Sequence, residues 1–368
     1  MAALMLASGP ATAQSVTETT DRVTIEASVI AAGLSHPWGM DFLPDGSILV
    51  TERDGRLRVV RDGELSQPLS GLPQIAARGQ GGLLDVAVAN DFLQSGEIFF
   101  TFSEPGRGGS GTALARAVLS GWTGDRPELT NVETIFSMAR KTRSGVHFGS
   151  RIVLAHDGTL FVTTGDRGDA DRSQDMDDHA GAVIRIARDG AVPAGNPFAN
   201  GGGAPEIWSK GHRNPQGAAL DSATGQLWTV EHGARGGDEI NRPEPGKNYG
   251  WPVISYGRHY SGVAIGRGTA APGYEQPLFY WDPSIAPSGL AVYRGEMFPE
   301  WDGDLLVGAL KYRLLSRLDR DETGAIVGEE RMLAGEFGRV RDVTVAPDGS
   351  VYLLTDEDPG AIVRITRK

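Results

Sequence analysis

The sequence predicts an all-β protein, a six-bladed β-propeller of four-stranded antiparallel blades. Three observations support this fold class: a repeated strand signature, a high glycine content and the lack of helical periodicity. Glycine supplies 51 of the 368 residues, roughly twice its average usage, which indicates many turns. No stretch of about 12 residues or more shows a 3.6-residue period, so few helices are expected.

An Asp-Gly turn that leads into a short β-branched or aromatic strand recurs along the chain. Close copies cover 44–51, 156–163 and 347–355, and looser copies cover 95–101, 224–229 and 302–307. The first apolar strand residues lie 46 to 78 residues apart, which suits one blade each: Ile48, Ile98, Leu160, Leu227, Leu305 and Val351. Small sheets bury one another around a common axis, which favours a propeller over the alternative, a pair of β-sandwiches.

Several copies are followed, after a second turn, by a strand with a basic residue near its end: 56–60, 182–186, 314–318 and 361–365. This order is typical of a β-meander and not of βαβ units. The strand-like segment 23–29 is expected to complete the last blade and close the ring. The sequence therefore predicts one propeller domain over residues 22–368.

Composition excludes several classes of protein and site. The chain has 35 Lys and Arg against 47 Asp and Glu, a net charge of −12, so no nucleic-acid partner is expected. No segment approaches the ~18 to 20 apolar residues of a spanning helix, so no membrane span is expected. The chain has no cysteine, so any metal must bind through oxygen or imidazole.

The N-terminus, residues 1–15, is interpreted as the remnant of a signal peptide. Met1–Ala7 resembles the end of an apolar core, and Ala11–Ala13 fits an A-x-A cleavage site, although a basic leading region is missing. This interpretation predicts a periplasmic or secreted protein. The alternative is an unstructured N-terminus on a cytoplasmic protein.

Insertions between the repeats carry the candidate chemistry. His147 is a candidate general base that Asp166 could orient, although a lone histidine is also often structural. In segment 231–239, glycines and the carboxylates of Asp238 and Glu239 could hold Ca²⁺, or could form an ordinary solvated loop.

Four cations could converge at one end of the ring and meet an anionic ligand, or could be scattered exposed side chains: Lys311, Arg313, Arg339 and Arg341. Six aspartates lie close together in the sequence: Asp166, Asp169, Asp171, Asp175, Asp177 and Asp178. This acidic run lacks the Gly and Glu of an EF-hand loop, so it is interpreted as a solvated loop. No serine-hydrolase, P-loop or dinucleotide fingerprint occurs in a strand-to-helix context.

Taken together, these motifs resemble the soluble pyrroloquinoline quinone (PQQ)-dependent sugar dehydrogenases, and within them the aldose sugar dehydrogenase branch. The resemblance runs from about Gly33 to Ile365 and is carried by His147 in H-F-G-S-R and by segments 211–217, 231–241, 246–252, 308–311 and 339–342. It implies a six-bladed propeller. It also implies oxidation of the C1 hydroxyl of an aldose sugar to a lactone, with electrons passed on to an external acceptor.

The resemblance implies roles for the candidate residues. His147 would take the proton of the anomeric hydroxyl while hydride passes from sugar C1 to quinone C5, and Asp166 would orient His147. Arg213 and Asn214 would lie beside the reactive carbonyls, where Arg213 would stabilise the developing oxyanion. The cofactor has three carboxylates, and the resemblance implies six further residues that would contact it: Gln80, Tyr260, Lys311, Arg313, Arg339 and Arg341. Gln80 and Trp281 would also contact the sugar.

Two calcium sites are implied as well. The backbone carbonyls of Gly233 and Ala234 match ligands of a Ca²⁺ that polarises the quinone, and Glu239 and Tyr249 resemble a second, structural site. The family usually has Pro after this Gly, so Ala234 is expected to change loop stiffness slightly. Two rival functions remain: a calcium-dependent lactonase, and a non-catalytic carbohydrate-binding propeller.

Overall fold

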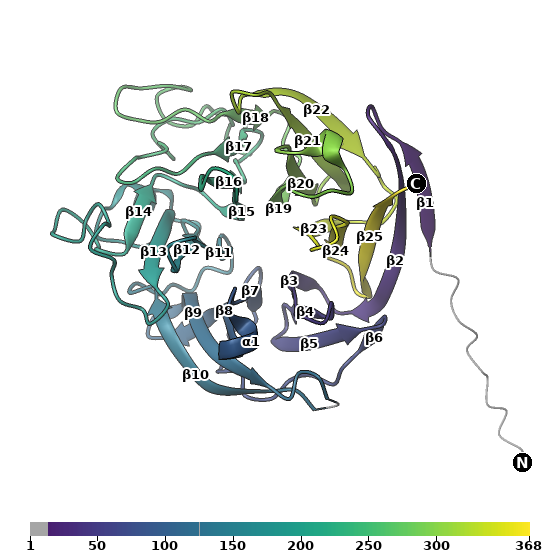
Figure 1. Ribbon diagram of the computed structural model, residues 1–368. Helices are drawn as coiled ribbons and strands as arrows, with labels where there is room; N and C mark the ends of the chain where they lie inside the picture. The colour runs from purple at the N-terminus through teal and green to yellow at the C-terminus, as the bar shows by residue number, and fades with distance from the viewer. Residues whose placement is uncertain (1–13, 125) are drawn as a thin grey trace, which may run out of the picture.

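Six antiparallel sheets surround a central axis in the computed structural model, which describes residues 14–124 and 126–368 (Figure 1). Blade 1 contains β3 (Pro37–Phe42), β4 (Ile48–Glu52), β5 (Arg56–Arg61) and β6 (Glu64–Leu65). Blade 2 contains β7 (Leu83–Val88), β8 (Glu97–Gly106), β9 (Gly109–Ser120) and β10 (Glu128–Ser137). Blade 3 contains β11 (Ile152–Leu154), β12 (Thr159–Thr164), β13 (Ala182–Ala187) and β14 (Ile207–Lys210).

The second half of the ring repeats this arrangement. Blade 4 contains β15 (Pro215–Leu220), β16 (Leu227–Glu231), β17 (Asp238–Asn241) and β18 (Phe279–Trp281). Blade 5 contains β19 (Pro287–Val292), β20 (Leu305–Ala309), β21 (Leu314–Arg320) and β22 (Ile326–Met332). Blade 6 contains β23 (Val340–Val345), β24 (Val351–Thr355), β25 (Gly360–Arg367), β2 (Thr24–Leu34) and β1 (Ser15–Thr19). The predicted six-bladed all-β fold is confirmed.

Each Asp-Gly repeat supplies the second strand of its blade: β4, β8, β12, β16, β20 and β24. The strands with a basic residue near their end are third strands: β5, β13, β21 and β25. Consecutive strands therefore pair as neighbours, as in a meander, with the first strand of every blade at the axis (Figure 1).

The two ends of the chain close the ring in one sheet. β2 pairs with β25 from Ile25 opposite Arg367 to Leu34 opposite Gly360, so the predicted closing strand is confirmed. β1 extends this sheet by a fifth strand and begins at Ser15, ahead of the predicted domain start at residue 22. The predicted apolar core and cleavage site of a signal peptide fall within residues 1–13, outside the described residues.

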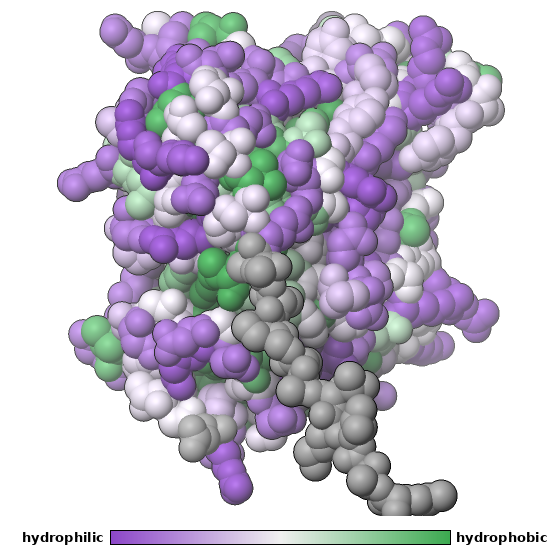
Figure 2. Space-filling model, turned by 90° about the vertical axis from the view of Figure 1, so that its right-hand side faces the viewer, coloured by the Kyte–Doolittle hydropathy of each residue, from purple (hydrophilic) through white to green (hydrophobic). Residues whose placement is uncertain are grey.

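Helices are short and few in the described chain, as predicted. They are α1 (Phe92–Ser95) and two 3₁₀ turns, η1 (Ala170–Gln174) and η2 (Pro299–Trp301). None of the helices in the described residues has the length and apolar character needed to cross a bilayer. The side of the ring that carries β1 and β2 is mostly hydrophilic, with small separate hydrophobic spots (Figure 2).

The hydrophobic core lies between the blades. Neighbouring sheets share buried clusters, as where Leu49 and Leu57 of blade 1 join Phe100 of blade 2, and where Trp228 of blade 4 joins Leu305 of blade 5. Because each sheet buries its faces against the next sheet, the blades hold one another in a closed ring.

A buried ion cluster joins the innermost strands across the axis. Arg151, just before β11, donates from Nη1 to Asp85 Oδ1 at 2.8 Å and lies 2.9 Å from Asp342 Oδ1. Its Nε donates to the Gln216 carbonyl at 3.2 Å, and its guanidinium lies 4.6 Å from the centre of the Trp38 ring. One guanidinium of blade 3 thereby contacts blades 1, 2, 4 and 6.

Replacement of Arg151 by Met is expected to lower the free energy of unfolding by about 3–5 kcal/mol, because two buried carboxylates lose their counter-charge. Urea unfolding measures this loss. Arg116→Met is the control, since the Arg116–Glu133 pair is exposed and is expected to contribute less than about 1 kcal/mol. Equal losses in the two variants would contradict a central role for Arg151.

Candidate active site

The candidate site residues lie at one end of the axis, because the meander order of the strands brings their loops to the same edge of each blade. In an antiparallel blade, the start of the first strand and the turn between the second and third strands lie at the same edge. Residues just before the innermost strands are Gln80, His147, Arg213 and Arg339, with Asn214 directly before β15. The turns between second and third strands carry Arg53, Asp166, His232, Lys311 and Asp356.

His147 and Asp166 form a tight pair. His147 Nδ1 lies 2.6 Å from Asp166 Oδ1, and the His147 N–H donates to Gln80 Oε1 at 2.7 Å. His147 has a left-handed backbone with φ 53°, and a Cβ added at Gly165 would lie 2.2 Å from the His147 carbonyl oxygen. Glycine at 165 is therefore required for the close approach that sets this pair.

Asp166 is held from three sides. Its Oδ1 also accepts the Gly168 N–H at 2.7 Å, and its Oδ2 accepts the indole N–H of Trp251 at 2.9 Å. Burial alone would raise the pKa of Asp166, but the hydrogen bond and the charge of His147 bring it below its ordinary value. Asp166 is therefore an anionic acceptor that fixes the His147 ring with its Nε2 directed away from Asp166.

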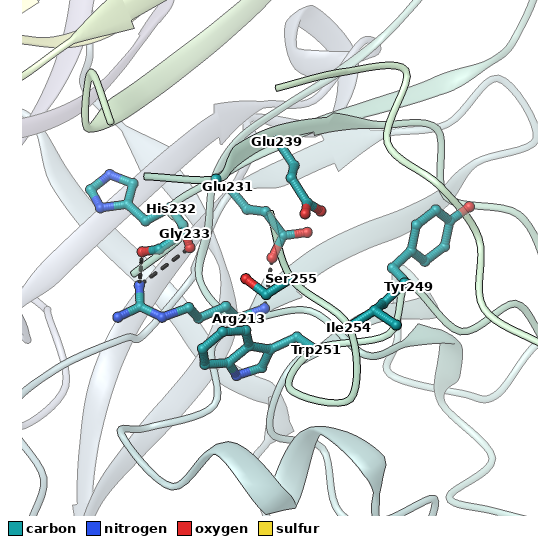
Figure 3. A pocket seen from close by; sticks show the side chains of 10 residues that line it. Arg213, Glu231, His232, Gly233, Glu239, Tyr249, Trp251, Ile254 and Ser255 are labelled. Carbon is teal, nitrogen blue, oxygen red and sulfur yellow. Dashed lines mark hydrogen bonds between the residues drawn. The ribbon is translucent and has the colours of Figure 1, made fainter. Parts of the chain in front are cut away.

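Arg213 contacts blade 4 through both its backbone and its side chain (Figure 3). Its backbone N–H donates to Glu231 Oε2 at 2.6 Å, and its Nη1 donates to the carbonyls of His232, at 3.2 Å, and of Gly233. The guanidinium lies 5.3 Å from the centre of the Trp251 ring. Trp251 thus contacts both Asp166 and Arg213, and the sequence interpretation missed this role because it treated 246–252 only as a motif.

A cavity of about 160 Å³ opens at the mouth of the axis. The predicted residues that line it are Gln80, Asn214, Arg339 and Arg341, together with Phe148 and Gly149 next to His147. Further lining residues that the sequence interpretation missed include Trp38, Arg53, Gln216, His232 and Asp356. Distant parts of the chain therefore bring cations and the neighbours of His147 to one mouth.

The charges of this mouth cavity suit an anionic ligand. Arg341 is 6% exposed, donates to Gln216 Oε1 at 3.0 Å and to Asp356 Oδ2 at 2.9 Å, and its buried Nε has no partner among the described residues. Arg339 donates to the Leu310 carbonyl at 3.4 Å. An unpartnered buried guanidinium N–H fits a carboxylate ligand, because such a donor is costly to leave unsatisfied.

A second, acidic pocket lies beside Arg213 and suits a cation. Glu231 and Glu239 both line it, and Asn241 Nδ2 donates to Glu231 Oε1 at 3.1 Å and to Glu239 Oε2 at 3.2 Å. Burial and the charge of Glu231 raise the pKa of Glu239 to about 8. Two buried carboxylates and the Gly233 carbonyl form a hard oxygen set of the kind that Ca²⁺ prefers.

The structure also places the other predicted metal ligands. The Tyr249 hydroxyl donates to the Arg242 carbonyl at 2.5 Å and points away from Glu239, so only the backbone carbonyl of Tyr249 is left as a possible ligand (Figure 3). Ala234 forms a β-bridge with Gly236. The described residues contain no group of three or more His, Asp or Glu side chains that could hold a metal ion.

Several predicted contacts lie elsewhere. Trp281 is 3% exposed, packs in the core between blades 4 and 5, and donates its indole N–H to Glu329 at 2.8 Å, so its ring has no face for a ligand. Tyr260 is 77% exposed in the loop before β18 and does not line the mouth cavity. Lys311 and Arg313 are exposed on the rim, next to Leu310, which does line it.

The acidic run is not a solvated loop throughout, which corrects the sequence interpretation. Asp178 is buried and accepts from Arg172 Nε at 2.7 Å and from its Nη2 at 2.9 Å. The buried Lys210 ammonium donates to the carbonyls of Arg172, Asp178 and Ala180 at 2.7–3.1 Å. Arg172 lies within the run, in η1, and Lys210 comes from β14, so the spacing of the acidic residues alone did not indicate burial.

His232 lies between the two pockets. Burial, assisted by the charges of Arg213 and Arg341, lowers the pKa of His232 to about 3. Its Nε2 lies 2.6 Å from the Pro287 carbonyl and therefore carries the proton of the neutral ring.

Comparisons with known proteins find matches to both the sequence and the fold of this chain. The family model described as Glucose / Sorbosone dehydrogenase matches residues 34–364. The chain is 42% identical to aldose sugar dehydrogenase YliI of Escherichia coli K12, over 93% of both chains. It is 45% identical to a solved glucose dehydrogenase, with a TM-score of 0.89 and 92% and 98% of the chains covered. A PQQ-bound aldose sugar dehydrogenase from Streptomyces coelicolor is 27% identical, with a TM-score of 0.77 and coverage of 96% and 99%.

Lowering the pH from about 6.5 to 4.5 is expected to cost the native protein about 1–3 kcal/mol through His232. The unfolded histidine takes up a proton near pH 6.5 and the folded one only near 3, so the contribution of His232 is complete above pH 6.5 and is lost as the pH falls. Urea unfolding of His232→Gln should show a flatter pH dependence. The exposed His156 is the control, and a profile for His232→Gln that matches His156→Gln would disprove the assignment.

Proposed function

Because the chain belongs to the glucose/sorbosone dehydrogenase family, we propose that it is a PQQ- and calcium-dependent aldose sugar dehydrogenase. It oxidises the C1 hydroxyl of an aldose to the lactone. The observation that carries the proposal is that the His147–Asp166 pair and Arg213 lie at the same end of the ring as the mouth cavity, which Arg339 and Arg341 line.

His147 acts as the general base. Asp166 holds Nδ1, so Nε2 is the atom that accepts the proton of the sugar hydroxyl. Trp251 and the Gly168 N–H keep Asp166 in place, and its negative charge stabilises the imidazolium that forms. Gln80 accepts from the His147 backbone and lies at the open side of the mouth, where a sugar would enter.

Arginines hold the cofactor. PQQ has three carboxylates and, when bound, supplies the hydride acceptor. Arg339 and Arg341 would bind carboxylates at the mouth, with Lys311 and Arg313 on the rim, and Arg213 and Asn214 would contact the polar part of the quinone. The unpartnered Nε of Arg341 supports this assignment. The rival lactonase leaves these cations without a ligand.

Calcium binding is proposed beside Arg213. The carbonyls of Gly233 and Ala234 would bind the ion that serves the cofactor, and Glu239 with the Tyr249 carbonyl would bind a structural ion. Gly233, Glu239 and Tyr249 line this pocket, and Ala234 follows Gly233 in the chain. The support is the oxygen-lined acidic pocket, in which Glu239 is neutral below a pH of about 8 without a cation. A Ca²⁺ ion held there would supply the positive charge that lets both carboxylates ionise.

We also propose where in the cell this enzyme acts. An enzyme of this kind passes its electrons to an external acceptor, and we place it in the periplasm or outside the cell on the Met1–Ala13 sequence pattern.

Replacement of His147 by Ala is expected to lower sugar-dependent dye reduction about 10²- to 10⁴-fold, because the base is lost, while PQQ still binds. Steady-state turnover and PQQ titration of the reconstituted enzyme measure the two effects. His156→Ala, at an exposed turn, should retain full turnover. Normal turnover in His147→Ala would refute the base. Cofactor-free opening of a lactone by the native protein, without sugar oxidation, would support the lactonase instead.

Calcium is expected to raise the melting temperature of the native protein, with about 2–3 kcal/mol of stabilisation at a hundredfold excess over Kd. Glu239→Gln should lose the part of this increase that comes from the structural ion and keep its calcium-free stability, because glutamine mimics the neutral carboxyl. Thermal unfolding with EGTA and with CaCl₂ tests both variants. Glu133→Gln, an exposed position, is the control. An unchanged calcium response in Glu239→Gln would exclude this residue as a ligand.

A further inference from the structure

Arg53 lies at the mouth cavity in the turn between β4 and β5 of blade 1. Its backbone is anchored on both sides: its N–H donates to the His36 carbonyl at 3.1 Å, and its carbonyl accepts the Leu83 N–H at 3.1 Å. A Cβ added at Gly82 would lie 1.7 Å from the Arg53 carbonyl oxygen, so glycine is required for this contact. The turn therefore holds Arg53 at the cavity wall.

The Arg53 side chain has no strong partner of its own. Its Nη1 lies 3.9 Å from Asp356 Oδ1, its side chain is 25% exposed, and its guanidinium makes no hydrogen bond within the described residues. Neighbouring arginines of the same blade differ, because Arg56 and Arg58 donate to Glu52 at 2.6 and 3.0 Å. Arg53 is the arginine of this turn whose donors are left for a ligand.

The charges around Arg53 do not balance. Three arginines line the mouth cavity, Arg53, Arg339 and Arg341, and one carboxylate, Asp356, faces all of them. Asp356 already accepts from Arg341 at 2.9 Å and from His36 Nδ1 at 3.1 Å. Although burial alone would raise it, the charges of Arg341 and Arg53 hold the pKa of Asp356 below its usual range. Gathering like charges is costly unless an anion joins them.

We infer that Arg53 is an additional carboxylate-binding residue of the mouth, which acts with Arg339 and Arg341 on one polyanionic ligand. This inference rests on the proposed function, in which that ligand is PQQ. Arg53 comes from blade 1 and the other two arginines from blade 6, so a ligand with several carboxylates contacts both blades at once.

The test is PQQ binding to the apo-protein in saturating CaCl₂, by calorimetry and by quenching of tryptophan fluorescence. Arg53→Gln is expected to weaken binding about 10- to 100-fold, the range for loss of a hydrogen bond to a charged group. Arg53→Lys keeps the charge but not the planar donor pair, and its Kd should lie between those of Arg53→Gln and the native protein. Arg61→Gln, on the outer part of the same blade, removes one charge elsewhere and should bind normally.

Each outcome has a separate meaning. A native protein that fails to bind PQQ would overturn the proposed function and this inference with it. A native protein that binds, with Arg53→Gln within twofold of it, would overturn the inference alone. If Arg53→Gln does not fold, as shown by circular dichroism, Arg53→Lys decides: binding equal to the native protein and equally sensitive to NaCl would count against a direct contact.

Discussion

The ring depends on one buried guanidinium at its axis. Arg151 binds the carboxylates of Asp85 and Asp342 and contacts Gln216 and Trp38, so a single side chain connects five of the six blades. Apolar packing between neighbouring sheets holds adjacent blades, but it does not link blades across the axis. Separating these buried carboxylates from the guanidinium would leave charges unpaired away from water, which costs free energy. The cluster therefore constrains how the innermost strands meet.

This cluster also forms the floor of the active site. Trp38 lines the mouth cavity, and the centre of its ring lies 4.6 Å from the Arg151 guanidinium and 5.8 Å from that of Arg341. A second cavity of about 290 Å³, lined by Asp85, Arg151 and Asp342, contacts the same cluster. Arg151 lines the second cavity and packs against Trp38, which lines the mouth cavity. The buried cluster therefore lies between the two cavities.

The site combines two electrostatic environments that meet at His232, which lines both pockets. The mouth cavity carries an excess of arginine over carboxylate, whereas the neighbouring pocket contains Glu231 and Glu239. Arg213 donates to Glu231 and to the Gly233 carbonyl and stacks on Trp251, which in turn fixes Asp166. The proposed anionic cofactor and the proposed divalent cation would each find opposite charge within one connected set of residues on a rigid propeller.

The sequence by itself determined the fold class, the six blades and the closing strand, because Asp-Gly turns and alternating strands are local signals. Its motifs also predicted His147 and Arg213 as site residues, and both lie at the same end of the ring. Only the tertiary structure decided which charges meet: Arg53 and Asp356 are separated by some three hundred residues and become neighbours when β2 closes the ring. Likewise Trp281, expected in the cleft, lies in the core, because burial depends on how neighbouring blades pack and not on residue type.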